Sequence, residues 1–269
     1  MRLAILCQEE PVFLGPFLRS VISLYPGRVV AVFIAGRRSA GESAGTVGER
    51  CRSLRILWNI MEPSGFFSAL ALRFRARLLG RRDPLSVEGL ARRLGIPVHR
   101  VADPNSPSFH QLLRQLAPDA VLNQSERLLK REVLSIPRIG FINRHASLLP
   151  EFRGRMACFR SHAAESPRYG VTIHIVDEGV DTGPILLQRE FADVDPRWPY
   201  PRVMRQLCKA APELLWDSVA LLEREDFSPR TQPTEGRNYA FPTLEEALQY
   251  RAQLAVRRRG TSGSGTPST

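Results

Sequence analysis

An asparagine and a histidine stand two residues apart in the segment NRHASLLPEFRG, residues 143–154. The residues just before it, IGFI, are apolar and predict a strand that runs into this segment. Side chains two residues apart on a strand point to the same side, so Asn143 and His145 would present an amide and an imidazole to one small volume. Ser147 has the same parity if the strand continues that far. The spacing predicts a polar site at the end of a strand.

A second polar group lies downstream, in the segment YGVTIHIVDEGVDTGPILLQ, residues 169–188. Two apolar runs flank DEGVDTG, so its acidic residues fall in a loop between two predicted strands. Asp177, Glu178 and Asp181 crowd this loop, and its glycines give the backbone freedom to turn. Because acidic, glycine-containing loops are most often plain turns, this motif alone does not establish a site.

The elements that must position these motifs alternate along the chain. Predicted strands cover residues 2–7, 28–36, 96–101, 118–123, 139–145, 170–176 and 183–191. Predicted helices cover residues 9–27, 54–61, 66–80, 87–95, 107–117, 201–225 and 243–259. Pro212 predicts a kink or boundary in the longest helix. The alternation predicts an α/β fold of three layers with a mostly parallel, Rossmann-like sheet, in which ligands bind beyond the carboxyl ends of the strands.

The character of the chain changes near residue 226. We expect residues 1–225 to form one large catalytic domain and residues 226–259 to form a short C-terminal extension that ends in an amphipathic helix. The last ten residues, 260–269, are low in complexity, and we expect them to be disordered.

The formal net charge is +11, and much of it lies in arginine-rich patches. Basic patches can bind nucleic acid, phosphorylated substrates or anionic cofactors, but they also occur on ordinary arginine-rich surfaces. No apolar run approaches the roughly 20 residues that a membrane span needs, and the N-terminus does not fit a secretory signal. The four cysteines are scattered, which disfavours a zinc site or a disulfide framework. We therefore expect a cytoplasmic protein without a metal.

Together, the two polar motifs resemble the signature of the folate-dependent formyltransferases. That signature is Asn-x-His-x-Ser-Leu-Leu-Pro, followed by Asp-x-Gly-x-Asp-x-Gly. The matching residues are Asn143, His145, Ser147 to Pro150, Gly154, Asp177, Gly179, Asp181 and Gly183. Two linked motifs in the right order are more specific than either alone, and the resemblance extends to about residue 225.

The resemblance implies transfer of a formyl group from 10-formyltetrahydrofolate, a co-substrate, to an amine through a tetrahedral intermediate. It implies that the amide of Asn143 donates to the formyl oxygen as negative charge develops there. His145, as a cation, would stabilise the same oxygen. Asp181 would favour that cation and help to carry protons from the attacking amine.

The resemblance also implies a pterin pocket formed by the segment at 123–140. Leu128 and Leu129 match an aliphatic pair in that pocket, although ordinary core packing would explain them equally well. The remaining residues that it implies for donor binding are Ser147, Asp177, Val180 and Gly183.

The class of acceptor amine is narrowed by comparing this sequence with the features that mark the branches of the resembled family. Glycinamide ribonucleotide transformylases have a glycine-rich phosphate loop after the first strand, where Glu9 and Glu10 of this chain would repel a phosphate. The tRNA enzymes add a C-terminal β-barrel and the hydrolases a preceding domain, and neither fits this sequence. We therefore expect a small biosynthetic amine: an amino sugar on a nucleotide, an amino acid or a hydroxylamine.

Several alternatives stay open. The arginine-rich segment at 50–95 could contact a nucleotide diphosphate, remain a solvated helix pair or form a homodimer contact. A methionyl-tRNA formyltransferase without the usual barrel would use the basic patches on nucleic acid. A non-catalytic folate-binding protein and a hydrolase that releases the formyl group to water are further rivals. His110, His162 and His174 are isolated in the sequence, and we expect them to be structural or exposed.

Overall fold

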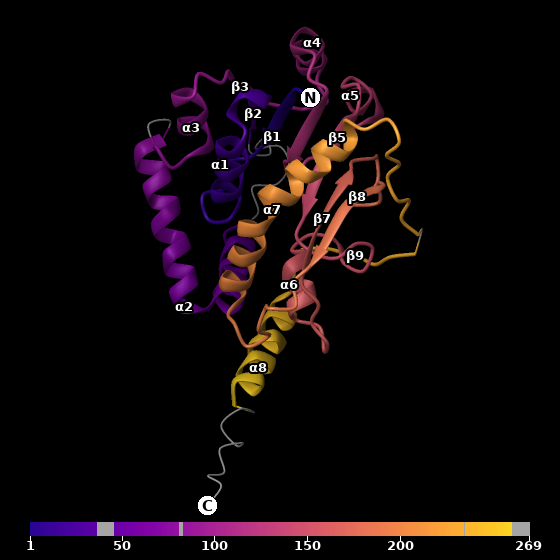
Figure 1. The fold of residues 1–269 in the computed structure, drawn as a ribbon. Coiled ribbons are helices and arrows are strands. Elements are labelled where there is room, and N and C mark those ends of the chain that lie inside the picture. Colours follow the sequence, from indigo (N-terminus) through magenta and orange to yellow (C-terminus); the bar gives the residue numbers. More distant parts are fainter. Residues whose placement is uncertain (37–45, 81–82, 234, 260–269) are drawn as a thin grey trace, which may run out of the picture.

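The structure is a computed structural model that describes residues 1–36, 46–80, 83–233 and 235–259. Its central sheet has seven strands in the order β3-β2-β1-β4-β5-β7-β8 (Figure 1). The strands are β1 (Leu3–Cys7), β2 (Val29–Ala35), β3 (Val98–Val101), β4 (Ala120–Gln124), β5 (Gly140–His145), β7 (Gly170–Ile175) and β8 (Ile185–Glu190). Strands β1 to β5 are parallel, and β7 and β8 are antiparallel to their neighbours. The predicted α/β fold with a mostly parallel sheet is confirmed, whereas the predicted disordered tail lies outside the described residues.

Helices cover both faces of the sheet. They are α1 (Leu14–Leu24), α2 (Val47–Leu79), α3 (Val87–Arg93), α4 (Pro107–Leu116), α5 (Arg131–Leu134), α6 (Ala157–His162), α7 (Tyr200–Leu222) and α8 (Leu244–Arg259), with a short 3-10 turn at Pro26–Arg28. Strand β1 shows the three layers, because its side chains alternate between two cores. Leu3 and Ile5 pack into the cluster that includes α1 and α7, whereas Leu6 packs with Phe109 and Leu113 of α4.

Helix α2 consists of two arms. Its N-terminus has a capping box, in which Thr46 and Glu49 satisfy each other's backbone amides. At Glu62 the backbone leaves the helical region, with φ of +57°, and Pro63 follows. The arms on either side of this bend, 47–61 and 63–79, contain the two helices predicted for this segment. No helix within the described ranges is long and apolar enough to cross a membrane.

The longest predicted helix runs through its proline. Helix α7 continues across Pro212, so the predicted boundary is wrong. Pro212 and the side chains around it are buried in the core that α7 shares with α1 and the sheet. Tertiary packing of this kind outweighs the one backbone hydrogen bond that a proline removes.

The C-terminal extension packs against the large domain. Tyr250 and Leu254 of α8 are buried in the main core, at the end of the molecule opposite α4 (Figure 1). Upstream of α8, β9 (Asn238–Tyr239) pairs in parallel with β6 (Arg153–Gly154). Strand β6 is the end of the first polar motif, so the extension reaches the region of the predicted site.

Candidate active site

The carboxyl end of β5 carries Asn143 and His145, and β7 lies beside it. In the antiparallel register, Asn143 is opposite His174 and His145 is opposite Thr172. This register brings Nδ2 of Asn143 to 3.1 Å from Nε2 of His174. Nδ1 of His174 is 2.7 Å from the carbonyl oxygen of Ile175, to which it donates, so Nε2 is free to accept from the amide of Asn143.

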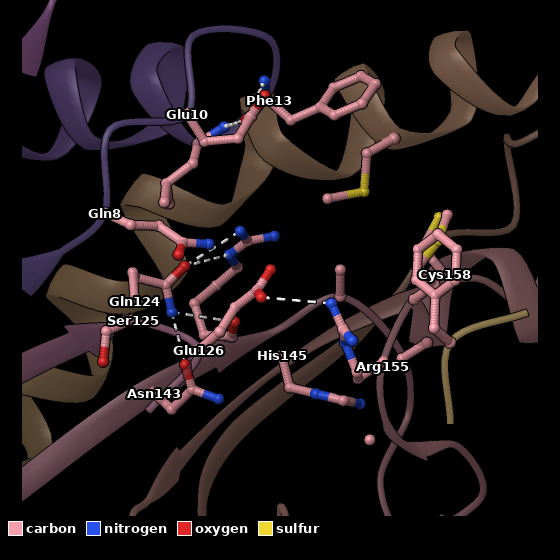
Figure 2. A pocket seen from close by; sticks show the side chains of 18 of the residues that line it. Gln8, Glu10, Phe13, Gln124, Ser125, Glu126, Asn143, His145, Arg155 and Cys158 are labelled. Carbon is pink, nitrogen blue, oxygen red and sulfur yellow. Dashed lines mark hydrogen bonds and ion pairs between the residues drawn. The ribbon is translucent and has the colours of Figure 1, made fainter. Parts of the chain in front are cut away.

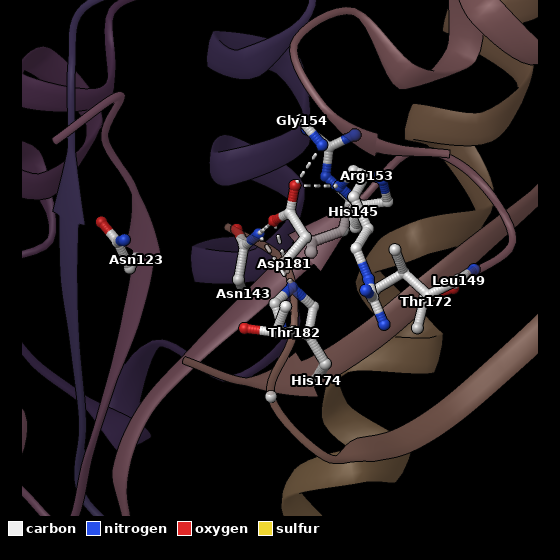
Figure 3. Close-up of polar contacts among 12 residues, drawn as sticks. Asn123, Asn143, His145, Leu149, Arg153, Gly154, Thr172, His174, Asp181 and Thr182 are labelled. Carbon is white, nitrogen blue, oxygen red and sulfur yellow. Dashed lines mark hydrogen bonds and ion pairs between the residues drawn. The ribbon is translucent and has the colours of Figure 1, made fainter. Parts of the chain in front are cut away.

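Asp181 reaches these side chains from the loop between β7 and β8, where its backbone adopts a left-handed φ of +54°. Together with Asn143, His145 and His174 it forms a group that is here called the polar cluster. Its Oδ2 lies 2.8 Å from the backbone nitrogen of Gly154 and 3.4 Å from Nδ1 of His145. Its Oδ1 lies 3.4 Å from Nδ2 of Asn143 and 3.6 Å from Nε2 of His174. Figure 3 shows the amide, the two imidazoles and the carboxylate turned toward one another.

The loop that presents Asp181 is held from two sides. Within the loop, Oδ1 of Asp177 accepts from the backbone of Gly179 at 3.1 Å and from the hydroxyl of Thr182 at 2.7 Å. From the C-terminal extension, Nε2 of Gln232 donates to the carbonyl oxygen of Asp181 at 3.1 Å. The unusual backbone of Asp181 is therefore fixed by contacts on both sides.

Burial and mutual contact set the charges in this cluster. Burial alone would raise the pKa of Asp181, but the nearby His145, His174 and the amide of Gly154 outweigh it and hold that pKa well below its usual range. Burial lowers the pKa of His145, and Asp181 offsets only part of this effect. At neutral pH the cluster therefore contains an ionised carboxylate beside a neutral imidazole.

Gln124, the last residue of β4, orients Asn143. Its Nε2 lies 2.5 Å from Oδ1 of Asn143, to which it donates, while its Oε1 accepts from Nε and Nη2 of Arg144 at 3.2 and 3.1 Å. Because the amide oxygen of Asn143 is engaged by Gln124, its NH₂ group is turned toward His174 and Asp181. Arg144 is buried, and its guanidinium lies 4.7 Å from the ring centre of Phe17.

A cavity of about 720 Å³ opens beside the cluster. One wall is the end of β4 and the segment after it, from Asn123 to Leu129, and the loop from Asp177 to Asp181 also lines the cavity. The residues before α1 and both arms of α2 line another part. Figure 2 shows Glu10 and Phe13 facing Asn143 and His145 across this space. The volume is in the range of sites that hold small ligands and cofactors.

A family model described as "Formyl transferase" matches residues 87–219, which include all of the polar cluster. Residues 87–219 belong to the formyl transferase family. The match agrees with the paired motifs and with the arrangement of β5, β7 and the acidic loop.

Several methionyl-tRNA formyltransferases are similar in sequence to this chain. The enzyme of Magnetococcus marinus is 37% identical over 161 residues, which are 60% of this chain and 51% of that protein. The enzyme of Mycobacterium avium is 36% identical over 177 residues, which are 65% of this chain and 55% of that protein. The chain thus spans about half the length of these relatives.

Solved formyltransferase structures share the fold. Glycinamide ribonucleotide transformylase 1 from Symbiobacterium toebii superposes with a TM-score of 0.53 at 20% identity, over 87% of this chain and 94% of that one. A sugar N-formyltransferase from Shewanella sp. gives 0.53 at 14% identity, over 94% and 88% of the two chains.

The structure brings most of the predicted formyltransferase residues to one place. Asn143, His145 and Asp181 all lie in the polar cluster, although their catalytic roles remain a prediction. Four of the residues predicted to bind the donor line the cavity, namely Leu128, Leu129, Asp177 and Val180. Leu129 is buried and Leu128 is exposed, so the pair presents one anchored and one accessible side chain.

Two other predicted donor-binding residues, Ser147 and Gly183, do not line the cavity, and their part in donor binding stays a prediction. The hydroxyl of Ser147 donates to the carbonyl oxygen of Phe152 at 3.0 Å, and the same oxygen lies 2.6 Å from Nε2 of His145. Ser147 therefore supports the histidine. At Gly183 an added Cβ would lie 2.0 Å from the carbonyl oxygen of Ile175, so this position needs glycine for close backbone approach.

The sequence reasoning missed His174, Gln124 and Arg144. His174 was expected to be structural or exposed, but it is buried within the cluster and touches Asn143. Its place on the predicted strand before the acidic loop was a usable signal, because that strand had to pair beside β5. Gln124 and Arg144 gave no comparable signal, since their contact arises only from the parallel pairing of β4 with β5.

Proposed function

We propose that this protein transfers a formyl group from 10-formyltetrahydrofolate to the amine of a small acceptor. The observation that carries the proposal is the convergence of an amide donor, an imidazole and an ionised carboxylate at one side of a cavity of about 720 Å³. The match of residues 87–219 to the formyl transferase family and the cavity wall formed by Asn123 to Leu129 support it.

The amide of Asn143 is suited to stabilise the tetrahedral intermediate. One of its N–H groups is already directed at Asp181, at the long distance of 3.4 Å between Nδ2 and Oδ1. A formyl oxygen would replace this weak contact, and the hydrogen bond would strengthen as the oxygen becomes an anion. Gln124 keeps the amide in the required orientation throughout.

Asp181 and His145 are suited to proton transfer. As the amine nitrogen bonds to the formyl carbon, it must lose a proton, and N10 of the folate must gain one when the bond from carbon to N10 breaks. The carboxylate of Asp181, ionised at neutral pH, can accept the first proton directly or through a water. Nδ1 and Nε2 of His145 both face oxygen acceptors, so a protonated imidazole is well placed beside the developing oxyanion.

The start of α1 supports an acceptor that does not place a phosphate there. The carboxylate oxygens of Glu10 lie 2.9, 2.8 and 2.8 Å from the backbone nitrogens of Val12, Phe13 and Leu14. A phosphate would need these same donors at a helix N-terminus. The acceptor classes left are an amino sugar on a nucleotide, an amino acid and a hydroxylamine.

The second candidate acceptor is methionyl-tRNA, because several relatives are named methionyl-tRNA formyltransferases. It predicts tight binding of initiator tRNA that weakens steeply with salt, since many phosphates would be neutralised by arginines. A small-amine enzyme would show no such dependence on salt.

The test is an assay with 10-formyltetrahydrofolate and a panel of amines, including nucleotide-linked amino sugars, amino acids, hydroxylamines and methionyl-tRNA. Amine-dependent release of tetrahydrofolate, with a product 28 Da heavier than the amine, is the expected result. Release without a formylated product would indicate a hydrolase. Folate binding with no turnover at all would indicate a non-catalytic binding protein.

A further inference from the structure

We infer that the acceptor amine carries an apolar group, and that this group binds between the start of α1 and the two arms of α2. The inference rests on the proposed formyl transfer and selects among its acceptors. The part of the cavity concerned is here called the apolar lobe. It is lined by Val12, Phe13, Leu57, Met61, Phe66 and Leu70.

The apolar lobe is a packed structure, built by the loop before α1 and by the two arms of α2. Val12, Met61 and Ala69 form a buried cluster of their own, and Phe13 and Phe66 pack against it. The cluster joins the loop before α1 to one arm of α2 through Met61 and to the other arm through Ala69. The bend at Glu62 is what lets both arms contribute to one wall.

Glu10 and Arg73 are the charged residues of the loop before α1 and of α2 that line the cavity, and each is engaged or exposed. The carboxylate of Glu10 accepts three backbone N–H groups, so it caps α1 and does not face a ligand as a free anion. Arg73, farther along the second arm, is exposed. A sugar or phosphate placed against Val12, Met61 and Phe66 would lose its water without gaining partners, which is costly.

The position of the apolar lobe suits the acceptor and not the donor. The donor-side wall is formed by the segment after β4 and by the acidic loop, next to the polar cluster. Figure 2 shows Phe13 on the far side of the cavity from Asn143 and His145. An amine whose nitrogen lies at the polar cluster can therefore extend an alkyl or aromatic group away from the folate and into the apolar lobe.

The first experiment measures kcat/KM for straight-chain primary amines from propylamine to octylamine, which have nearly the same basicity. If each added methylene is buried in the apolar lobe, kcat/KM rises about fourfold per methylene until the lobe is full. A nucleotide-linked amino sugar, a polar amino acid and methionyl-tRNA are assayed beside them.

The second experiment uses Leu70→Glu. Leu70 is half exposed, so a carboxylate there stays hydrated and leaves the helix intact. The variant is expected to lower kcat/KM for hexylamine about tenfold and to raise it for 1,6-diaminohexane, whose second ammonium can pair with the new carboxylate. The matched control is Leu78→Glu on the same arm, where the side chain is exposed and does not line the cavity, and it should change neither value.

The outcomes separate this inference from the proposed function. A flat dependence on chain length, or a nucleotide-linked amino sugar preferred over every alkylamine, overturns the apolar acceptor and leaves formyl transfer standing. An unchanged preference in Leu70→Glu, with the fold intact by circular dichroism, also overturns it. If no amine of either kind is formylated, the proposed function itself fails.

Discussion

The imidazole of His145 lies between two oxygen acceptors, the carboxylate of Asp181 and the carbonyl of Phe152. A neutral imidazole has one N–H and can satisfy only one of them, whereas an imidazolium satisfies both. Burial opposes the charge, and in the unliganded protein burial prevails. In the proposed reaction, negative charge that develops on a substrate oxygen would add to Asp181 and shift this balance, so we expect His145 to become cationic when the intermediate forms.

Replacing Asn143 by Ala should lower kcat about 10²- to 10³-fold, because the principal N–H donor to the developing oxyanion is lost, at a cost of roughly 3 to 4 kcal/mol. The donor KM should change little, since the cavity wall from Asn123 to Leu129 is untouched. Steady-state kinetics with the best amine checks this result. Asn59→Ala on α2 is the matched control, and equal rates for the two variants would contradict the role of Asn143.

His162 should make the free energy of unfolding depend on pH. Burial lowers its pKa to about 4, with ring nitrogens 2.7 Å from the hydroxyl of Tyr169 and 3.0 Å from the carbonyl oxygen of Trp198. Between about pH 6.5 and 4 the unfolded chain binds a proton on this residue that the folded chain does not. Stability therefore falls as the pH drops through this window, by up to about 1.4 kcal/mol per pH unit.

The measurement is urea unfolding of the wild type and of His162→Gln at pH values from 7.5 to 4. The glutamine does not titrate, so the variant should show a shallower loss of stability across the window. Equal slopes for the two proteins would contradict the assignment.

At the scale of elements, the register of three neighbouring strands builds the site. The apolar runs made β4, β5 and β7 predictable to within two residues, because each is buried along most of its length. The Asn-x-His spacing and the acidic loop were also readable, since both are local in the sequence. The contacts of Gln124 with Asn143 and of Asn143 with His174 depend on strand pairing, which no local pattern specifies.

The link between β4 and β5 can be tested with Gln124→Glu. The carboxylate keeps an acceptor for Arg144, so the melting temperature should be maintained. It has no N–H to offer Oδ1 of Asn143, and the amide loses its fixed orientation. We expect kcat to fall about tenfold, the effect of one hydrogen bond of roughly 1.5 kcal/mol, with little change in the donor KM. Loss of stability with unchanged kcat would show that Gln124 acts only on the fold.

Local signals misled where packing decides the outcome. Pro212 suggested an interruption, but the helix around it is held by buried side chains on both sides. Ser147 has the parity of Asn143 and His145, yet β5 ends at His145 and the chain turns, so the serine points to Phe152. In both cases the preference of a single residue yielded to its tertiary surroundings.

At the scale of the whole molecule, the C-terminal extension and the large domain share one core. Tyr250 is almost fully buried, and its hydroxyl accepts from the backbone nitrogen of Tyr200, 3.2 Å away. Gln232 of the same extension holds the loop that presents Asp181. The boundary expected near residue 226 therefore separates segments of different composition that pack as one body.

Replacing Tyr250 by Ala should lower the free energy of unfolding by about 3 to 5 kcal/mol, because a large buried ring is lost and a cavity is left. Leu248→Ala is the matched control on the same helix, where the side chain is half exposed, and should cost far less. Urea unfolding at pH 7.5 measures both. Similar losses for the two variants would show that α8 is not part of the cooperative unit.

Glu62, at the bend of α2, is bound by Arg258 near the end of α8, with distances of 2.6 and 3.0 Å between guanidinium nitrogens and carboxylate oxygens. The angle between the two arms is thereby tied to the last turn of α8, far from Asn143 along the backbone. Proteolytic removal of the residues from Arg258 onward would release this ion pair while leaving Asn143, His145 and Asp181 in place. Such a cut would change the preference among acceptor amines more than it changed kcat for the preferred amine.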